Sequence, residues 1–141
     1  MNDQQLNALL TTFPHTRYHA EWRLFTWHPR GLLDDALADE VVGWIGSEER
    51  FEEVPFHRYA DFGGLTEIRL KIGHVFQIVQ HRREAREPVK SAFFANTTVG
   101  FGMARMYEAL MQGAMIQVRA FRERAAAAEW LGVPVETLQP N

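Results

Sequence analysis

Residues 89–110, VKSAFFANTTVGFGMARMYEAL, indicate the fold of this chain best. The stretch begins with a short and almost continuous apolar run, which is typical of a central strand covered on both faces. A polar bend follows at residues 96–98, and apolar side chains then recur at helical spacing, at Met103, Met106, Tyr107 and Leu110. The stretch therefore predicts a strand that leads directly into a helix.

The segments on both sides repeat this order. Residues 116–121 predict the next strand, and the last helix has an apolar face at Ala127, Trp130 and Leu131, with Gly132 and Pro134 ending it. Towards the N-terminus, residues 18–27 and 54–62 have the composition of strands. The helix after each of them has an apolar stripe, at Leu33, Leu37, Val41 and Trp44 in one and at Ile72, Val75, Phe76 and Val79 in the other.

Three details complete the prediction. The first of these helices is expected to end at Gly46 and Ser47, and residues 68–72 could be one more extended segment or the lead-in to the second helix. Residues 1–14 predict a short amphipathic helix that ends at Pro14. Strands joined through helices must be mostly parallel with right-handed crossovers, so residues 15–141 are expected to form one α/β domain.

Composition narrows the possible functions. The chain has no cysteine, which excludes disulfides, thiol catalysis and cysteine-based metal sites. The net charge is −3 and the densest basic run, residues 82–86, is broken by Glu84, so we interpret it as the solvated end of a helix and expect no nucleic-acid partner. There is no apolar stretch of about 20 residues to span a membrane and no secretory signal, so we expect a cytoplasmic protein.

Several stretches resemble one family. Residues 58–66, RYADFGGLT, resemble the strand-to-loop element of STAS domains, the family of anti-sigma-factor antagonists. Residues 88–92 through 102–106, and the ending at residues 118–122 and 128–131, look like its SpoIIAA-like subgroup. The resemblance covers roughly residues 54–134 and implies a SpoIIAA-like (STAS) α/β fold, with a four- to five-stranded, mostly parallel sheet and flanking helices. It also implies action through protein contacts or a small bound ligand.

The chain departs from this family at one functional position. Signalling members carry a phosphorylated serine at the start of the helix after the strand that contains the aspartate, and phosphorylation there disrupts a partner interface. Residues 68–71, IRLK, stand at that place, and no hydroxyl is among them. We therefore expect a non-catalytic regulatory or scaffolding module without this switch, which contacts a protein partner near residues 72–83.

A second hypothesis concerns the edge of the sheet where ligands bind in open α/β folds. Three segments reach that edge, and their candidate ligand-binding residues are Asp61, Asn96, Thr97, Thr98, Gly100, Gly102, Arg122 and Arg124. The free N–H groups at a helix start suit an anion, and an arginine could add a charged hydrogen bond. The alternative is that Thr97 or Thr98 only caps the helix and the glycines only permit the turn.

The same hypothesis includes an apolar pocket beneath that loop. Its lining could come from Phe93, Phe94, Phe101, Met103 and Met106, and it would suit a lipid or an acyl carboxylate. Such residues more often belong to the core. The protein would then be a carrier or sensor of a small anionic or lipid-like ligand.

Catalysis and metal binding have little support in the sequence. Ser47 and Ser91, the only serines, lie outside any nucleophile elbow, and the 96–102 loop contains no histidine, so we expect no enzyme and no cofactor. His57 and Asp61 would be about 13 Å apart on a strand, and His74 and His81 lie two helical turns apart, so we expect no metal site. The aromatic content of 12% favours an interface core, and we expect a homodimer.

Overall fold

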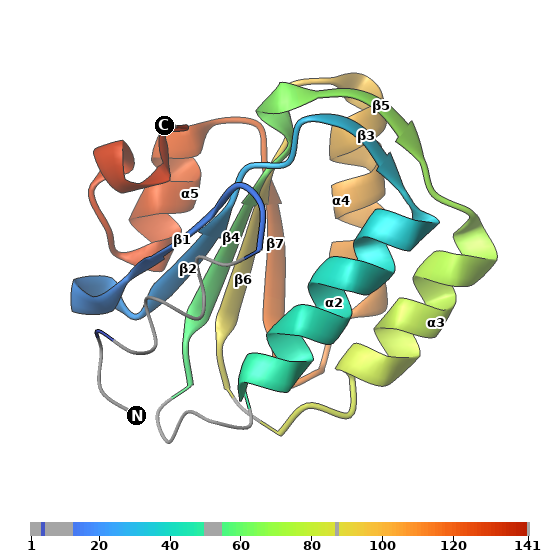
Figure 1. Ribbon diagram of the computed structural model, residues 1–141, viewed down its shortest axis with the longest axis horizontal. Helices are drawn as coiled ribbons and strands as arrows, with labels where there is room; N and C mark the ends of the chain where they lie inside the picture. Colours follow the sequence, from blue (N-terminus) through green and yellow to red (C-terminus); the bar gives the residue numbers. More distant parts are fainter. Residues whose placement is uncertain (1–3, 5–12, 50–54, 87, 141) are drawn as a thin grey trace.

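The computed structural model describes residues 4, 13–49, 55–86 and 88–140 (Figure 1). The helix predicted for residues 1–14 falls almost entirely outside them and stays a prediction. Within the described residues the chain forms an α/β fold with a mostly parallel five-stranded sheet and four α-helices. The predicted α/β class is therefore confirmed.

The main sheet has the strand order β1-β2-β4-β6-β7. The strands are β1 (Thr16–His19), β2 (Leu24–Trp27), β4 (His57–Asp61), β6 (Lys90–Phe94) and β7 (Gln117–Phe121). Only β1 runs antiparallel to its neighbour, and the other described pairs are parallel. The central position of β6, between β4 and β7, agrees with its apolar sequence, because a strand covered on both faces has no solvated side.

The N-terminal part of the sheet corrects the prediction of one strand over residues 18–27. A short 3-10 helix, Ala20–Trp22, interrupts that stretch and turns the chain back between β1 and β2. Arg23 ends the turn in the left-handed region, with φ of 48°. Because the aromatic residues continue through the turn, and no glycine or proline marks it, the sequence pattern gave no sign of a hairpin.

A second sheet pairs β3 (Gly31–Asp34) with β5 (Leu65–Arg69) in parallel. The extended alternative for residues 68–72 is thus correct up to Arg69, and α3 (Ile72–Arg82) follows. Leu33 belongs to β3 instead of the first helix, because the Asp34 carboxylate accepts a hydrogen bond from the Leu37 N–H at 2.9 Å and begins α2 (Asp35–Glu49). That helix continues past Gly46 and Ser47, where it was expected to end.

The helices cover the two faces of the main sheet unequally (Figure 1). One face packs against α2, α3 and α4 (Thr98–Leu110), and the other packs against α5 (Arg124–Leu131) and a 3-10 helix at Val135–Leu138. Gly132, with φ of 75°, ends α5 as predicted. Side chains alternate between the faces along each strand, so β4 directs Arg58 and Ala60 to the three-helix face and Tyr59 and Asp61 to the α5 face.

Candidate functional site

The three segments predicted to meet at one edge of the sheet do end side by side. Asp61 is in register with Phe94, and Phe94 with Phe121, so the residues after these strands share one edge. The predicted site residues nevertheless separate into three arrangements. These are an ionic network around Asp61, a helix cap at Thr97, and a surface depression between α5 and the end of β6.

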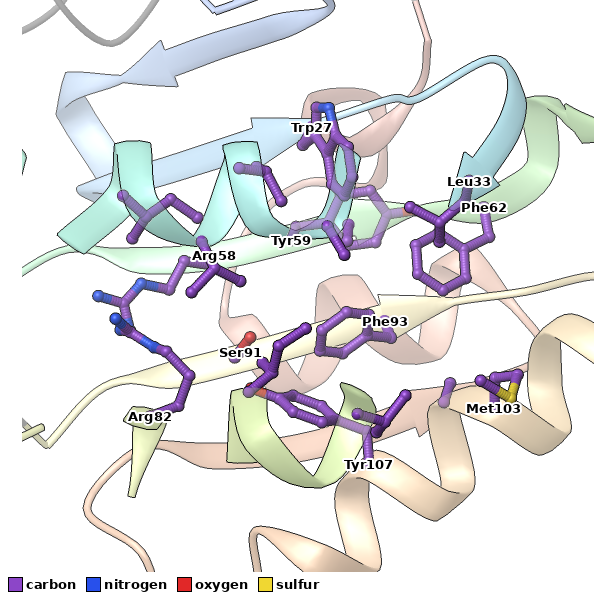
Figure 2. A pocket seen from close by; sticks show the side chains of 18 of the residues that line it. Trp27, Leu33, Arg58, Tyr59, Phe62, Arg82, Ser91, Phe93, Met103 and Tyr107 are labelled. Atoms are coloured by element: carbon purple, nitrogen blue, oxygen red, sulfur yellow. The ribbon is translucent and has the colours of Figure 1, made fainter. Parts of the chain in front are cut away.

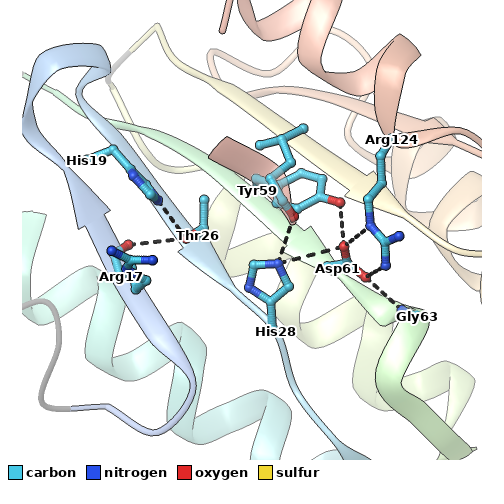
Figure 3. A network of polar contacts seen from close by, with 9 residues as sticks. Arg17, His19, Thr26, His28, Tyr59, Asp61, Gly63 and Arg124 are labelled. Carbon is cyan, nitrogen blue, oxygen red and sulfur yellow. Dashed lines mark hydrogen bonds and ion pairs between the residues drawn. The ribbon is translucent and has the colours of Figure 1, made fainter. Parts of the chain in front are cut away.

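Asp61 is the acceptor at the centre of a buried network on the α5 face (Figure 3). Its side chain is 2% exposed, and Arg124 donates to it from Nε at 2.7 Å and from Nη2 at 3.3 Å. The Tyr59 hydroxyl donates at 2.7 Å and the Gly63 N–H at 2.9 Å. The carboxylate is therefore bound on both oxygens by the protein itself, which suits a structural role.

The network also fixes the end of the chain against the sheet. His28 Nε2 lies 2.8 Å from the carbonyl oxygen of Leu138 and 3.7 Å from an oxygen of Asp61. Since a carbonyl only accepts, Nε2 carries the proton in that bond. No sequence pattern predicted His28 here, because it follows β2 while its partners lie much farther along the chain.

A side chain at Gly63 would displace part of the same network. A Cβ at this position would lie 2.8 Å from Arg124 Nη2 and 2.9 Å from Asp61 Oδ1, distances that real side chains do not adopt. Burial and the neighbouring Asp61 raise the pKa of Tyr59, so its hydroxyl remains a donor. The hydrogen bond to Asp61 raises the pKa of Arg124.

The turn between β6 and α4 forms a helix cap. The Thr97 hydroxyl accepts a hydrogen bond from the Gly100 N–H at 3.0 Å, and a Cβ at Gly100 would come within 2.9 Å of that hydroxyl. Thr98 is exposed, and Gly102 has open space where a side chain would be. The capping alternative thus explains Thr97 and Gly100.

The two arginines predicted near this turn have other contacts. The Arg122 guanidinium lies over the ring of Phe101 at 4.2 Å, and Arg124 is paired with Asp61. Asn96, Arg122 and Arg124 line a surface depression together with Glu123. The eight predicted residues therefore do not surround one ligand site.

A cavity of about 150 Å³ lies on the opposite face of the sheet (Figure 2). Its sheet wall is formed by side chains that include Phe25, Trp27, Ala60 and Phe93, and its helix wall by side chains that include Val41, Ile45, Val75, Ile78, Met103 and Ala104. Phe93 and Met103 were among the five residues predicted to line an apolar pocket. Phe94, Phe101 and Met106 do not line this one, and Phe94 faces α5 because it alternates with Phe93.

One end of the cavity is polar. Arg58 and Arg82 are 6% and 7% exposed, and both line the cavity together with Ser91 and Tyr107. Figure 2 shows the two arginine side chains at one end of the lining, with Met103 at the other. Burial raises the pKa of Tyr107, and the positive charges of Arg82 and Arg58 act in the opposite direction, which places the phenol within the field of both.

The interpretation of residues 82–86 as a solvated helix end is wrong for Arg82. This residue lies three positions after Val79 and seven after Val75, so it continues the apolar stripe of α3 into the interior. The sequence indicated the burial of Arg58 in a similar way. Arg58 lies two residues before Ala60 on β4, so both side chains point to the face that packs against the helices. Periodicity could therefore have identified both arginines as buried.

Two further properties bear on function. In the part of the chain that the structure describes, no group of three histidine, aspartate or glutamate side chains could hold a metal ion. None of the described helices is both long enough and apolar enough to cross a membrane.

Comparison of the whole chain with models of known protein families gives no match, and comparison with curated proteins gives none either. The STAS resemblance of residues 54–134 thus stays a prediction from the sequence.

Proposed function

We propose that this protein is a non-catalytic binding module that holds a small ligand with an apolar body in the cavity beneath α2, α3 and α4. The cavity itself carries the proposal. Protein interiors are close-packed and contain few spaces larger than a water molecule. This cavity, which is partly open to solvent, has a volume of about 150 Å³.

An unfilled space of this size lowers the free energy of unfolding. Side chains that line an unfilled space lack packing partners on one side and lose the dispersion contacts that those partners would supply. A ligand that fills the cavity would recover part of this free energy, which supports a binding role over a packing defect.

This proposal differs from the carrier hypothesis drawn from the sequence in its location. That hypothesis centred on residues 96–102, where Thr97 and Gly100 form a helix cap. The cavity is lined instead by β2, β4 and β6 and by the inner sides of three helices. That hypothesis named a small anionic or lipid-like ligand, and the present proposal keeps from it a small molecule with an apolar body.

Binding to the cavity is tested with 1-hexanol and the ¹⁵N-labelled full chain. We expect saturable changes in the amide NMR signals of β6 and of the first two turns of α4, whose residues Phe93, Met103 and Ala104 line the cavity. Ala104→Leu should abolish these changes because the larger side chain fills the space. Ala109→Leu is the matched control, since Ala109 is exposed on the same helix.

Two results would contradict the proposal. The first is a titration in which amides around the cavity keep their positions at saturating 1-hexanol. The second is equal binding by Ala104→Leu and the wild-type chain.

A second candidate function is a regulatory or scaffolding module of the STAS type that acts through protein contacts. The observation that favours it is the exposure of Ile72 and Phe76, at 60% and 50%, one turn apart at the start of α3. A specific partner recovered with the wild-type chain should be lost with Phe76→Glu. Retention of that partner by the variant would exclude this surface.

The proposal also keeps two expectations from the sequence, a cytoplasmic location and a homodimer. Light scattering during size-exclusion chromatography measures the mass of the assembly directly. A dimer that dissociates in Phe76→Glu would assign the α3 surface to contacts between copies, and a monomer in the wild type would remove the expectation of a homodimer.

A further inference from the structure

The aromatic side chains of the cavity wall indicate which class of ligand it selects, and the inference rests on the function proposed above. We infer that the ligand carries one aromatic ring, which lies against the ring of Phe93 inside the cavity. An aliphatic molecule of the same size would fill the space as well, but it would gain less from this wall.

Phe93 presents ring surface to the cavity (Figure 2). It lies on β6, which has a strand on each side, and its side chain points to the face covered by α2, α3 and α4. In a close-packed interior such a side chain is fully buried, yet Phe93 is only half-buried. Because the sheet and the helices surround it, the part of its ring that stays accessible faces the cavity.

Two neighbouring rings hold Phe93 in edge-to-face contacts. The ring centroids of Phe93 and Phe62 lie 5.7 Å apart with the planes at 62°, and those of Phe93 and Tyr107 lie 5.4 Å apart with the planes at 74°. Aromatic rings prefer this geometry because the positive edge of one ring meets the negative face of the other. These contacts fix the orientation of the Phe93 ring, so a ligand ring would meet a wall that does not have to reorganise.

Other side chains of the lining also favour an aromatic ligand. Met103 lines the cavity from α4 and is half-buried. A thioether sulfur makes a favourable contact with the edge of an aromatic ring, and an aliphatic ring offers no such edge. Phe25 and Trp27 supply further aromatic surface on the sheet wall.

The size of the cavity limits the ligand to a single ring. Its volume of about 150 Å³ is close to that of an engineered cavity that binds benzene. Because the cavity is partly open to solvent, a substituent on the ring can extend out of it. The inferred ligand class is therefore one aromatic ring with a substituent that reaches the opening.

Phenol and cyclohexanol separate an aromatic ring from an aliphatic ring of similar size. Each has six ring carbons and one hydroxyl, and both are uncharged at pH 7. They are titrated into the ¹⁵N-labelled full chain and followed by the amide NMR signals around the cavity. We expect phenol to bind more tightly than cyclohexanol by roughly two- to tenfold, the usual contribution of one aromatic pair beyond its buried area.

Two variants then assign the preference to the ring of Phe93. Phe93→Leu keeps an apolar side chain and should remove most of the preference for phenol over cyclohexanol. Phe94→Leu is the matched control, because the same change at the next residue affects the α5 face and should leave the preference unchanged. In the wild-type chain, we also expect nuclear Overhauser effects between phenol and the ring protons of Phe93.

The outcomes distinguish this inference from the proposed function. Equal binding of phenol and cyclohexanol, tighter binding of cyclohexanol, or binding of 1-hexanol alone would overturn the aromatic inference and leave the cavity as a binding site. A preference for phenol that Phe93→Leu retains would overturn it too, because another group would be the source. Absence of binding by all three probes would overturn both proposals. If Phe93→Leu does not fold, the nuclear Overhauser effects decide the same point, and their absence would count against the inference.

Discussion

The two faces of the main sheet place arginine side chains in different surroundings. On the α5 face, Arg124 meets Asp61, and the surrounding side chains of Ala127 and Leu138 have no exposed surface. On the three-helix face, Arg58 and Arg82 line a volume that side chains do not fill. Since alternate residues of β4 supply both faces, one short strand separates a tightly packed region from the cavity that we propose binds a ligand.

The largest expected change in stability concerns the α5 face, where Asp61 pairs with Arg124. Asp61→Asn should lower the free energy of unfolding by about 3 kcal/mol, because it leaves the Arg124 charge without its partner. We place the effect at the low end for a buried pair because the Arg124 side chain is 33% exposed and water can reach it. Urea unfolding measures it as a lower midpoint with an unchanged slope.

A matched aspartate controls for the loss of charge. Asp39 also contacts a basic side chain, His74, at 2.7 Å, but its side chain is 60% exposed. Asp39→Asn should change stability by at most about 1 kcal/mol, as surface pairs do. If the two variants were equally stable, Asp61 would not be structural and a ligand role for it would be open again.

The second prediction compares the packing of the two faces by the same change, alanine to leucine, at one position on each face. Ala127→Leu on α5 should cost about 1–3 kcal/mol, because a close-packed site cannot accept extra methylenes without strain. Ala104→Leu on α4, beside the cavity, should change stability by less than about 1 kcal/mol in either direction. Thermal and urea unfolding of both variants provide the measurement. Equal losses would mean that the three-helix face is packed as tightly as the other.

The sequence predicted the elements with strong periodicity and failed where tertiary contacts decide the structure. The order from β6 to α5 follows from the apolar run at residues 89–95, the helical stripes and Gly132. The hairpin of β1 and β2 was missed because its turn has no glycine or proline and uses Arg23 in the left-handed region. Local composition cannot indicate that reversal.

The candidate site was predicted only in part, for a different reason. The sequence identified Asp61 and Arg124 as residues of one sheet edge, but whether two charged groups meet a ligand or each other depends on distances across the fold. It also predicted that Phe93 and Met103 line an apolar pocket, but it assigned Arg82 to a solvated helix end and did not place Arg58 at the pocket. The spacing of Arg58 from Ala60 on β4, and of Arg82 from Val75 and Val79 on α3, indicated that both arginines are buried.

The third prediction concerns the turn at residues 96–102, for which the sequence left open an anion site or a helix cap. Thr97→Ala should cost about 1 kcal/mol, because the Gly100 N–H loses its acceptor at the start of α4. Thr98→Ala, at the exposed neighbouring position, should cost much less, because no hydrogen bond from its side chain caps the helix. Urea unfolding compares the two. A larger loss for Thr98 would contradict the assignment of Thr97 as the cap.

The last effect is a pH dependence at the edge of the α5 face. His57 Nδ1 accepts a hydrogen bond from the Lys90 N–H at 3.0 Å, so its imidazole must be unprotonated at that nitrogen. Burial, followed by the charges of Lys90 and Arg58, lowers the pKa of His57 below 6.5. Burial and then the charge of Arg17 lower the pKa of His19 in the same way.

These shifts set the direction of the change in stability. Below pH 6.5 the unfolded chain binds protons that the folded chain does not, so the free energy of unfolding falls as the pH falls from about 7 to 5. His57→Gln should flatten this slope, because glutamine does not titrate and its carbonyl can accept the same N–H, and His19→Gln combined with it should flatten the slope further. Urea midpoints at several pH values give the measurement. An unchanged slope in the double variant would mean that neither imidazole is held neutral by the fold, and that the hydrogen bond from Lys90 does not restrain His57.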